Sequence, residues 1–141
     1  MSGLKVAEAA REWIGTPYHH QASSRGAGTD CLGLVLGVWR DLAGEIPADV
    51  PAYTMDWAEP QQDEALWRAA REHLRELDGP EPGAIVLFRM RDGMVAKHLG
   101  VISSLDPNLH FIHAYMRHGV IESPLSTPWQ RRVVSYFAFP E

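Results

Sequence analysis

The sequence contains little of what several classes of protein require. Its single cysteine, Cys31, excludes an internal disulfide, which leaves packing, metal ligation, redox chemistry or nucleophilic attack as its role. No apolar run approaches the roughly 20 residues that span a bilayer. With 13 Lys and Arg against 18 Asp and Glu, the net charge is -5. This charge argues against nucleic acid or an anionic membrane as the main partner, because phosphate binding usually requires a basic face.

The N-terminus also lacks the features of a secretory signal. Residues 1–12 are charged and have neither an apolar core nor a small-residue cleavage site. We therefore expect synthesis and folding in the cytoplasm. A length of 141 residues with 45% apolar content suits one packed core. We expect a single domain over residues 1–141 with one active site.

Helices are predicted in the first half of the chain. Apolar residues recur at helical spacing over Leu4–Ile14, Cys31–Leu42 and Asp63–Leu77. Glycine and serine make Tyr18–Thr29 a loop. The proline-rich residues 44–60 are irregular, and Tyr53 and Trp57 within them suggest packing on the body of the domain.

Strands are predicted in the second half, separated by glycine, proline and aspartate. They are Ala84–Arg89, His98–Ser103, Leu109–Tyr115, Val120–Glu122 and Arg132–Phe139. Helices followed by strands indicate an α+β fold, in which N-terminal helices pack on an antiparallel β-sheet.

Cys31 falls in the first turn of its predicted helix, with Thr29 or Asp30 at the N-cap position. A helix N-terminus offers partial positive charge and N–H groups that favour a thiolate, the reactive form of cysteine. Free cysteine is also among the most buried residue types, so this position alone fits a core residue as well as a nucleophile.

Two histidines favour the nucleophile. If Ser103 pairs with Asn108 across a four-residue loop, His98 lies directly opposite His113, with Cβ atoms about 5 Å apart. His110 would then point to the other face of the sheet, because strand side chains alternate.

In the catalytic interpretation, His98 takes the proton of Cys31 and His113 orients the His98 ring. A zinc site is the rival interpretation, since the same three side chains could supply three ligands. The sequence has no close ligand pair such as CxxC or HxxxH, which weakens the case for zinc.

Five short segments together resemble the NlpC/P60 family of peptidases. DCLGLV at residues 30–35 resembles the nucleophile motif D-C-S-G-x-V. The others, in family order, are GTPY at 15–18, PGAIVLF at 82–88, KHLGV at 97–101 and FIHA at 111–114. Leu32 and Ala84 replace the usual serine and aspartate, and neither change removes a catalytic group. His19-His20-Gln21-Ala22 replaces the paired glycines that often follow the tyrosine, so the substrate groove is expected to differ there.

The resemblance implies a papain-like domain that cuts peptidoglycan stem peptides, with Cys31 as nucleophile, His98 as general base and His113 as third member. Tyr18 matches the tyrosine that helps line the oxyanion site, and the Cys31 N–H would be the other donor. Asp30 could orient Arg25 or recognise a substrate amine, although N-capping is the simpler role. The implied bond joins γ-D-glutamate to diaminopimelate, and neither a metal nor an organic cofactor is implied.

A narrower resemblance is to short NlpC/P60 peptidases from the tail gene clusters of phages and gene transfer agents. It is carried by the segments TDCLGLV, ALWRAA, LFRMRDG, AKHLGV and GVIESPLS. It implies assembly into a tail particle, tail-tip or hub proteins as partners, and action on the periplasmic cell wall during DNA delivery. Two alternatives stay open: a non-catalytic tail component, and an amidase or acyltransferase with the same triad.

Overall fold

The computed structural model describes residues 1–50 and 64–140. Tyr53, Trp57 and the predicted helix start at Asp63 lie outside these residues. The first half contains α1 (Gly3–Arg11), β1 (Ser23–Ser24), β2 (Gly28–Thr29) and α2 (Cys31–Ala43). The second half contains α3 (Ala65–His73), β3 (Arg75–Leu77), β4 (Ile85–Arg89), β5 (Ala96–Ser104), β6 (His110–Tyr115), β7 (Gly119–Pro124), α4 (Thr127–Gln130) and β8 (Val133–Ala138).

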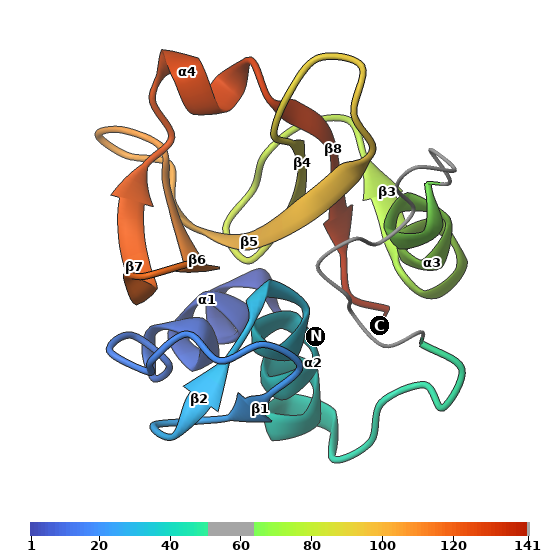
Figure 1. Cartoon of the computed structure of the whole chain (residues 1–141), viewed down its shortest axis with the longest axis vertical. Coiled ribbons are helices and arrows are strands. Elements are labelled where there is room, and N and C mark those ends of the chain that lie inside the picture. Colours follow the sequence, from blue (N-terminus) through green and yellow to red (C-terminus); the bar gives the residue numbers. More distant parts are fainter. Residues whose placement is uncertain (51–63, 141) are drawn as a thin grey trace.

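Strands β3 to β8 form one six-stranded antiparallel sheet with the order β3-β8-β4-β5-β6-β7. Figure 1 shows α1 and α2, with the small β1–β2 pair, beneath this curved sheet. The predicted α+β fold with helices packed on an antiparallel sheet is confirmed. Within residues 1–50 and 64–140, no helix is long and apolar enough to cross a membrane.

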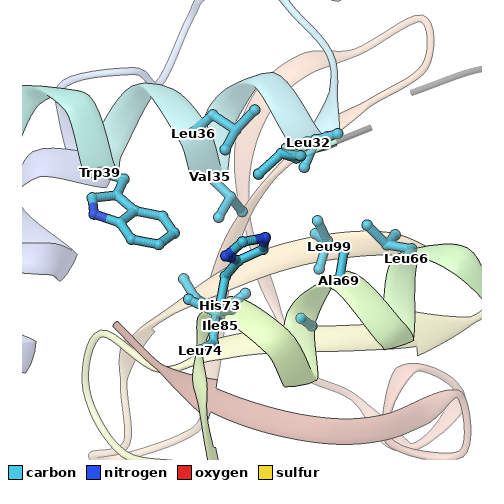
Figure 2. Close-up of a pocket in the computed structure, with 12 residues that line it drawn as sticks. Leu32, Val35, Leu36, Trp39, Leu66, Ala69, His73, Leu74, Ile85 and Leu99 are labelled. Carbon is cyan, nitrogen blue, oxygen red and sulfur yellow. The ribbon is translucent and has the colours of Figure 1, made fainter. Parts of the chain in front are cut away.

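The face of the sheet toward α2 carries the main core. Leu34, Val35 and Val38 of α2 belong to the same buried cluster as Leu99 of β5 and Ile112 of β6. Figure 2 shows how α3 extends this core, with Leu66 and Ala69 across from Leu32 and Leu36, and with Ile85 and Leu99 lining the same pocket. Burial of α2 around most of its circumference explains why its sequence is apolar on nearly every side.

The prediction of one helix through Leu77 is wrong. α3 ends at His73, and Leu77 lies in β3, where it pairs with Tyr136 of β8. Leu74, with an extended backbone, still packs against the main core, while Leu77 packs against the cluster on the opposite face of the sheet. Pairing with β8 supplies backbone hydrogen bonds to this segment, and that tertiary gain overrides its helical spacing.

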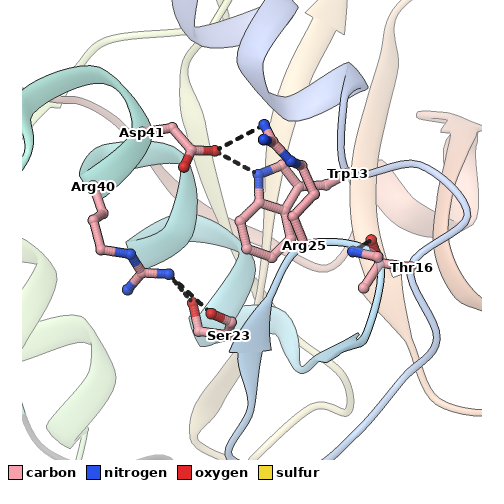
Figure 3. Close-up of polar contacts among 7 residues, drawn as sticks. Trp13, Thr16, Ser23, Arg25, Arg40 and Asp41 are labelled. Carbon is pink, nitrogen blue, oxygen red and sulfur yellow. Dashed lines mark hydrogen bonds and ion pairs between the residues drawn. The ribbon is translucent and has the colours of Figure 1, made fainter.

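The segment Tyr18–Thr29 is more ordered than a plain loop. Ser23 pairs with Thr29 in β1–β2, and Tyr18 forms a parallel bridge to Thr29. Contacts to the helices hold this segment in place (Figure 3): Arg40 Nη2 donates to Ser23 O at 2.9 Å and to Ser23 Oγ at 3.1 Å, and Arg25 pairs with Asp41 at 3.5 Å. The backbone around Tyr18 is therefore fixed relative to α2.

Gly33 allows the closest approach between this segment and α2. A Cβ atom built on Gly33 would lie 2.0 Å from the Ala22 backbone oxygen, far inside van der Waals contact. The glycine of the nucleophile segment is therefore explained by packing.

We expect Gly33→Ala to destabilise the fold by about 1–3 kcal/mol in urea unfolding, because a backbone carbonyl must move. Helix propensity alone would give the opposite sign, a gain of about 1 kcal/mol. Gly79→Ala is the control, since nothing lies within 4 Å of a Cβ at Gly79. A stabilised Gly33→Ala variant would show that the contact with Ala22 is not real.

Candidate active site

Asp30 caps the helix that begins at Cys31. Its Oδ1 accepts a hydrogen bond from the Gly33 N–H at 2.7 Å, and its Oδ2 accepts one from the Gln21 N–H at 2.7 Å. Asp30 is only 1% exposed, and burial raises the pKa of its carboxyl while the two backbone N–H groups oppose that rise. The capping role is confirmed, and the same carboxylate ties the Tyr18 segment to the start of α2.

Cys31 lies in the first turn of α2, as predicted, against the start of β5. Its Sγ lies 3.7 Å from the carbonyl oxygen of Lys97, the residue before His98. Here β5 contains a β-bulge: Ala96 pairs with Arg89 and His98 with Phe88, so Lys97 is the extra residue. Bulges commonly re-aim groups beside active sites. This one turns the Lys97 carbonyl toward the thiol while His98 follows directly along the strand.

The two histidines meet, although not by the predicted register. Val101 pairs with Ile112, which is displaced by two residues from the predicted pairing and places Gly100 opposite His113. A shift of two residues keeps each side chain on its face. His98 Nε2 therefore still reaches His113 Nδ1, diagonally, at 2.8 Å. Because Gly100 has no side chain, nothing projects from β5 between the two rings.

His110 is turned away from this pair, as the alternation of side chains predicts. Its Nδ1 lies 3.0 Å from the Asn108 carbonyl oxygen and 3.5 Å from Ser104 Oγ, at the far end of the hairpin. The structure therefore brings His113, and not His110, into contact with His98, and only the exact strand pairing differs from the prediction.

A third strand completes the row of polar groups. His113 Nε2 lies 3.0 Å from Ser123 Oγ of β7. If His98 Nδ1 is to accept the proton of Cys31, the His98 Nε2–H must donate to His113 Nδ1, and the His113 Nε2–H must donate to Ser123 Oγ. With His98 in that role, the contacts across the three strands require one tautomer for each ring. The sequence analysis missed Ser123, whose role follows only from its position beside His113 across β6 and β7.

Trp129 encloses the histidines and was also missed. Trp129 lies in the short helix α4. Its ring centroid is 5.8 Å from that of His98 and 5.1 Å from that of His113. Tyr115 lies on another side, 6.0 Å from His98 and 5.3 Å from His113 by the same measure. Such an aromatic enclosure holds the imidazoles away from bulk water.

Burial makes both imidazoles hard to protonate. Desolvation, and then the charge of Arg132, lower the pKa of His98 to about 4. Desolvation, and then the charges of His98 and His118, lower the pKa of His113 to about 3. Both rings are therefore neutral at pH 7, which is the state that a general base requires.

These lowered pKa values predict that acid destabilises the fold. Between pH 6.5 and about 4 the unfolded chain, with ordinary histidines, binds more protons than the folded protein, so stability falls as the pH falls. We expect a loss of about 4 kcal/mol between pH 7.5 and pH 5, roughly 2 kcal/mol from each histidine, measured by urea unfolding. The free energy of unfolding of the His113→Asn variant should fall less over this pH interval, because one of the two buried histidines is absent. Equal stability of the wild type at the two pH values would contradict the prediction.

Tyr18 lies in the same electrostatic environment as the thiol. Burial, followed by the negative charges of Cys31 and Asp30, raises the pKa of Tyr18 to about 12. The phenol therefore keeps its proton at neutral pH and can donate a hydrogen bond. This is the property that the predicted oxyanion role requires.

The histidine geometry favours hydrogen bonding over zinc ligation. Two nitrogens on a tetrahedral zinc lie roughly 3.3 Å apart, given bonds of about 2.05 Å. The 2.8 Å separation of His98 Nε2 and His113 Nδ1 is shorter and matches a hydrogen bond. Among the described residues, the ligand atoms that gather within 4.8 Å of one another belong instead to Asp49, Glu72 and His73.

An α+β domain with a cysteine at a helix start beside a strand that carries paired histidines has the architecture of the papain-like class. The sequence model of the NlpC/P60 family matches residues 15–138, and the chain belongs to this family of peptidoglycan hydrolases. None of the curated proteins matches the sequence.

Solved structures share this fold at low sequence identity. The NlpC/p60 domain of the peptidoglycan hydrolase SagA is 17% identical, with a TM-score of 0.64, over 99% of this chain and 100% of that one. An NlpC/P60 family protein from Bacillus cereus is 17% identical, with a TM-score of 0.70, over 99% of this chain and 40% of that one. A protein of the same family from Staphylococcus aureus, described as similar to lipoprotein, is 21% identical, with a TM-score of 0.62. The match covers 99% of this chain and 41% of that one. The chain therefore spans about two fifths of the latter two proteins.

Proposed function

We propose that this protein is a cysteine peptidase that hydrolyses an amide bond in the stem peptides of peptidoglycan. The observation that carries the proposal is the row of groups from the Cys31 thiol, 3.7 Å from the Lys97 carbonyl, through His98 and His113 to Ser123. Membership of the NlpC/P60 family supports it, and SagA, which shares the fold, is a peptidoglycan hydrolase.

In the proposed reaction, His98 Nδ1 takes the thiol proton, since Nε2 of the same ring is held by His113. The sulfur attacks the amide carbon, and the Cys31 N–H and the Tyr18 hydroxyl donate hydrogen bonds to the oxyanion. The C–N bond then breaks as His98 returns the proton to the leaving amine, which gives a thioester. Water, deprotonated by His98, cleaves the thioester and restores the thiol.

The proposed bond joins γ-D-glutamate to diaminopimelate, as the family resemblance implies. Digestion of purified peptidoglycan, with products identified by mass spectrometry, tests both the activity and the bond. Products ending in γ-D-glutamate are expected. Release of whole stem peptides from the sugar would show an amidase, and the absence of any product would leave a binding role.

We further propose that the enzyme acts from a phage-like tail and opens the wall locally for DNA delivery, with tail-tip or hub proteins as partners. The segments shared with short tail-cluster peptidases support this, including TDCLGLV and AKHLGV. Mass spectrometry of purified tail particles from the producing cells should detect the chain with hub proteins. Recovery of the chain only outside particles would overturn the tail proposal without affecting the chemistry.

A further inference from the structure

A cation-lined cavity lies beside the histidine pair. It has a volume of about 520 Å³ and is lined by Met90, Arg91, Met94, Lys97, Tyr115 and Arg132. Three of these six side chains are cationic, although the chain as a whole carries a net charge of -5. Among the residues that the structure describes, no acidic side chain lines this cavity. The local charge therefore opposes that of the whole molecule and favours an anionic ligand.

The positive surface continues past the cavity. A neighbouring hollow of about 290 Å³ shares Met90, Arg91 and Arg132 with it and adds Arg89 and Arg131, with Asp92 and Pro128 completing its lining. Arg91 and Arg132 thus stand on the border between the two hollows. From either hollow, an incoming anion meets these two guanidinium groups.

The cavity is adjacent to the reacting groups. Lys97, in its wall, presents its carbonyl oxygen to Cys31 Sγ at 3.7 Å. Tyr115, also in its wall, has its ring centroid 6.0 Å from that of His98. Arg132 lies over the Trp129 ring, with its guanidinium carbon 5.2 Å from the ring centroid, and its charge lowers the pKa of His98. The cavity therefore lies on the imidazole side of the site.

The chemistry of peptide cleavage determines which half of the substrate this side receives. His98 protonates the leaving amine, so the amine half must lie next to the imidazole. The acyl half lies toward the proposed oxyanion donors, the Cys31 N–H and the Tyr18 hydroxyl. A ligand in the cavity is thus part of the amine half.

Resting on the function proposed above, we infer that this cavity binds a carboxylate on the amine side of the scissile bond, with Arg91 and Arg132 as its cationic partners. Diaminopimelate has the matching chemistry, because its side chain ends, after a run of methylene groups, in a carbon that bears a carboxylate beside an ammonium, whereas a lysine side chain ends in the ammonium alone. The thioether side chains of Met90 and Met94 line the same cavity and suit the methylene groups. Guanidinium groups bind carboxylates through two parallel hydrogen bonds, which gives orientation as well as affinity. Lysine at the same stem position lacks that carboxylate, so the cavity selects diaminopimelate over lysine.

The test compares two synthetic stem peptides that differ only in diaminopimelate or lysine after γ-D-glutamate. We expect the wild type to prefer the diaminopimelate peptide, and Arg91→Gln to raise KM for that peptide about tenfold with kcat little changed. The same substitution should change the KM for the lysine peptide far less. Arg91→Lys should retain part of the preference, since lysine keeps the positive charge but cannot form the two parallel hydrogen bonds of a guanidinium group. Arg75→Gln is the matched control, because Arg75 is exposed on β3 and does not line this cavity.

Two results would overturn the inference while leaving the peptidase intact: equal cleavage of both peptides by the wild type, or an equal loss on both peptides in Arg91→Gln. Failure of the wild type to cut either peptide would instead contradict the proposed function. Binding of the diaminopimelate peptide to Cys31→Ala, measured by calorimetry, then tests the cavity by itself. The additional change Arg91→Gln should weaken that binding about tenfold, and unchanged binding would also overturn the inference.

Discussion

Replacing Cys31 with alanine is expected to reduce the hydrolysis of peptidoglycan stem peptides by at least about a thousandfold. The sulfur is the only thiol in the chain, and it lies in the first turn of α2 against the residue that precedes His98. No other nucleophile at the site can form the thioester. The measurement is the rate of product release, quantified by mass spectrometry of digested peptidoglycan.

Loss of folding would produce the same result, so structure must be checked in parallel. Cys31 is 2% exposed and belongs to the main core, and alanine removes its sulfur atom from that core. Thermal unfolding should show a folded protein with a modestly lower Tm. Cys31→Ser keeps the size of the side chain and should be nearly as inactive, because a serine hydroxyl beside a neutral imidazole is the weaker nucleophile. Rates close to wild type in both variants would remove Cys31 from the mechanism.

Replacing His98 with alanine is expected to reduce the rate by about a thousandfold, while His110→Ala stays within about twofold of the wild type. His98 contacts His113 at 2.8 Å and follows the residue that touches the thiol, whereas the His110 ring lies within hydrogen-bonding distance of Ser104 and Asn108. The two histidines lie on adjacent strands of the same sheet, so the comparison separates chemistry from a general effect of losing an imidazole.

A second measurement distinguishes a base from a structural residue. Alkylation of Cys31 by iodoacetamide should be slower in His98→Ala at pH 7, because less thiolate forms without the proton acceptor. His110→Ala should react at the wild-type rate. Comparable losses of peptidase activity at positions 98 and 110, or unchanged alkylation in His98→Ala, would contradict the assignment of His98.

The order of helices and strands could be predicted from the sequence because turn residues separate the strands and α2 is apolar throughout. The segment after α3 could not be predicted, because Leu74 and Leu77 suit helical spacing although Leu74 has an extended backbone and Leu77 lies in strand β3. The register of β5 and β6 was missed for a related reason. The hairpin closes at Ser104 and His110, three residues from the predicted pairing, and a bulge between Ile102 and Ser104 reduces this shift to two. No periodicity in the sequence marks the closing pair or the bulge.

The site was predictable where chemistry and spacing coincide, at Cys31, His98 and His113. An even shift of register left the two imidazoles on one face, so their contact survived an incorrect pairing. Ser123 and Trp129 were not predictable. A serine and a tryptophan have many roles, and only the three-dimensional arrangement shows that they touch His113.

Gly100 is important to the proposed catalytic site because it has no side chain. A single methyl group there would lie 2.8 Å from Phe111 Cδ2 and 3.4 Å from His113 Cβ, and Phe111 packs on the His113 ring. A search that scores reactive side chains would pass over position 100. An engineer who randomises the neighbourhood to broaden specificity should hold this position fixed, because any side chain there would displace Phe111 and the neighbouring His113.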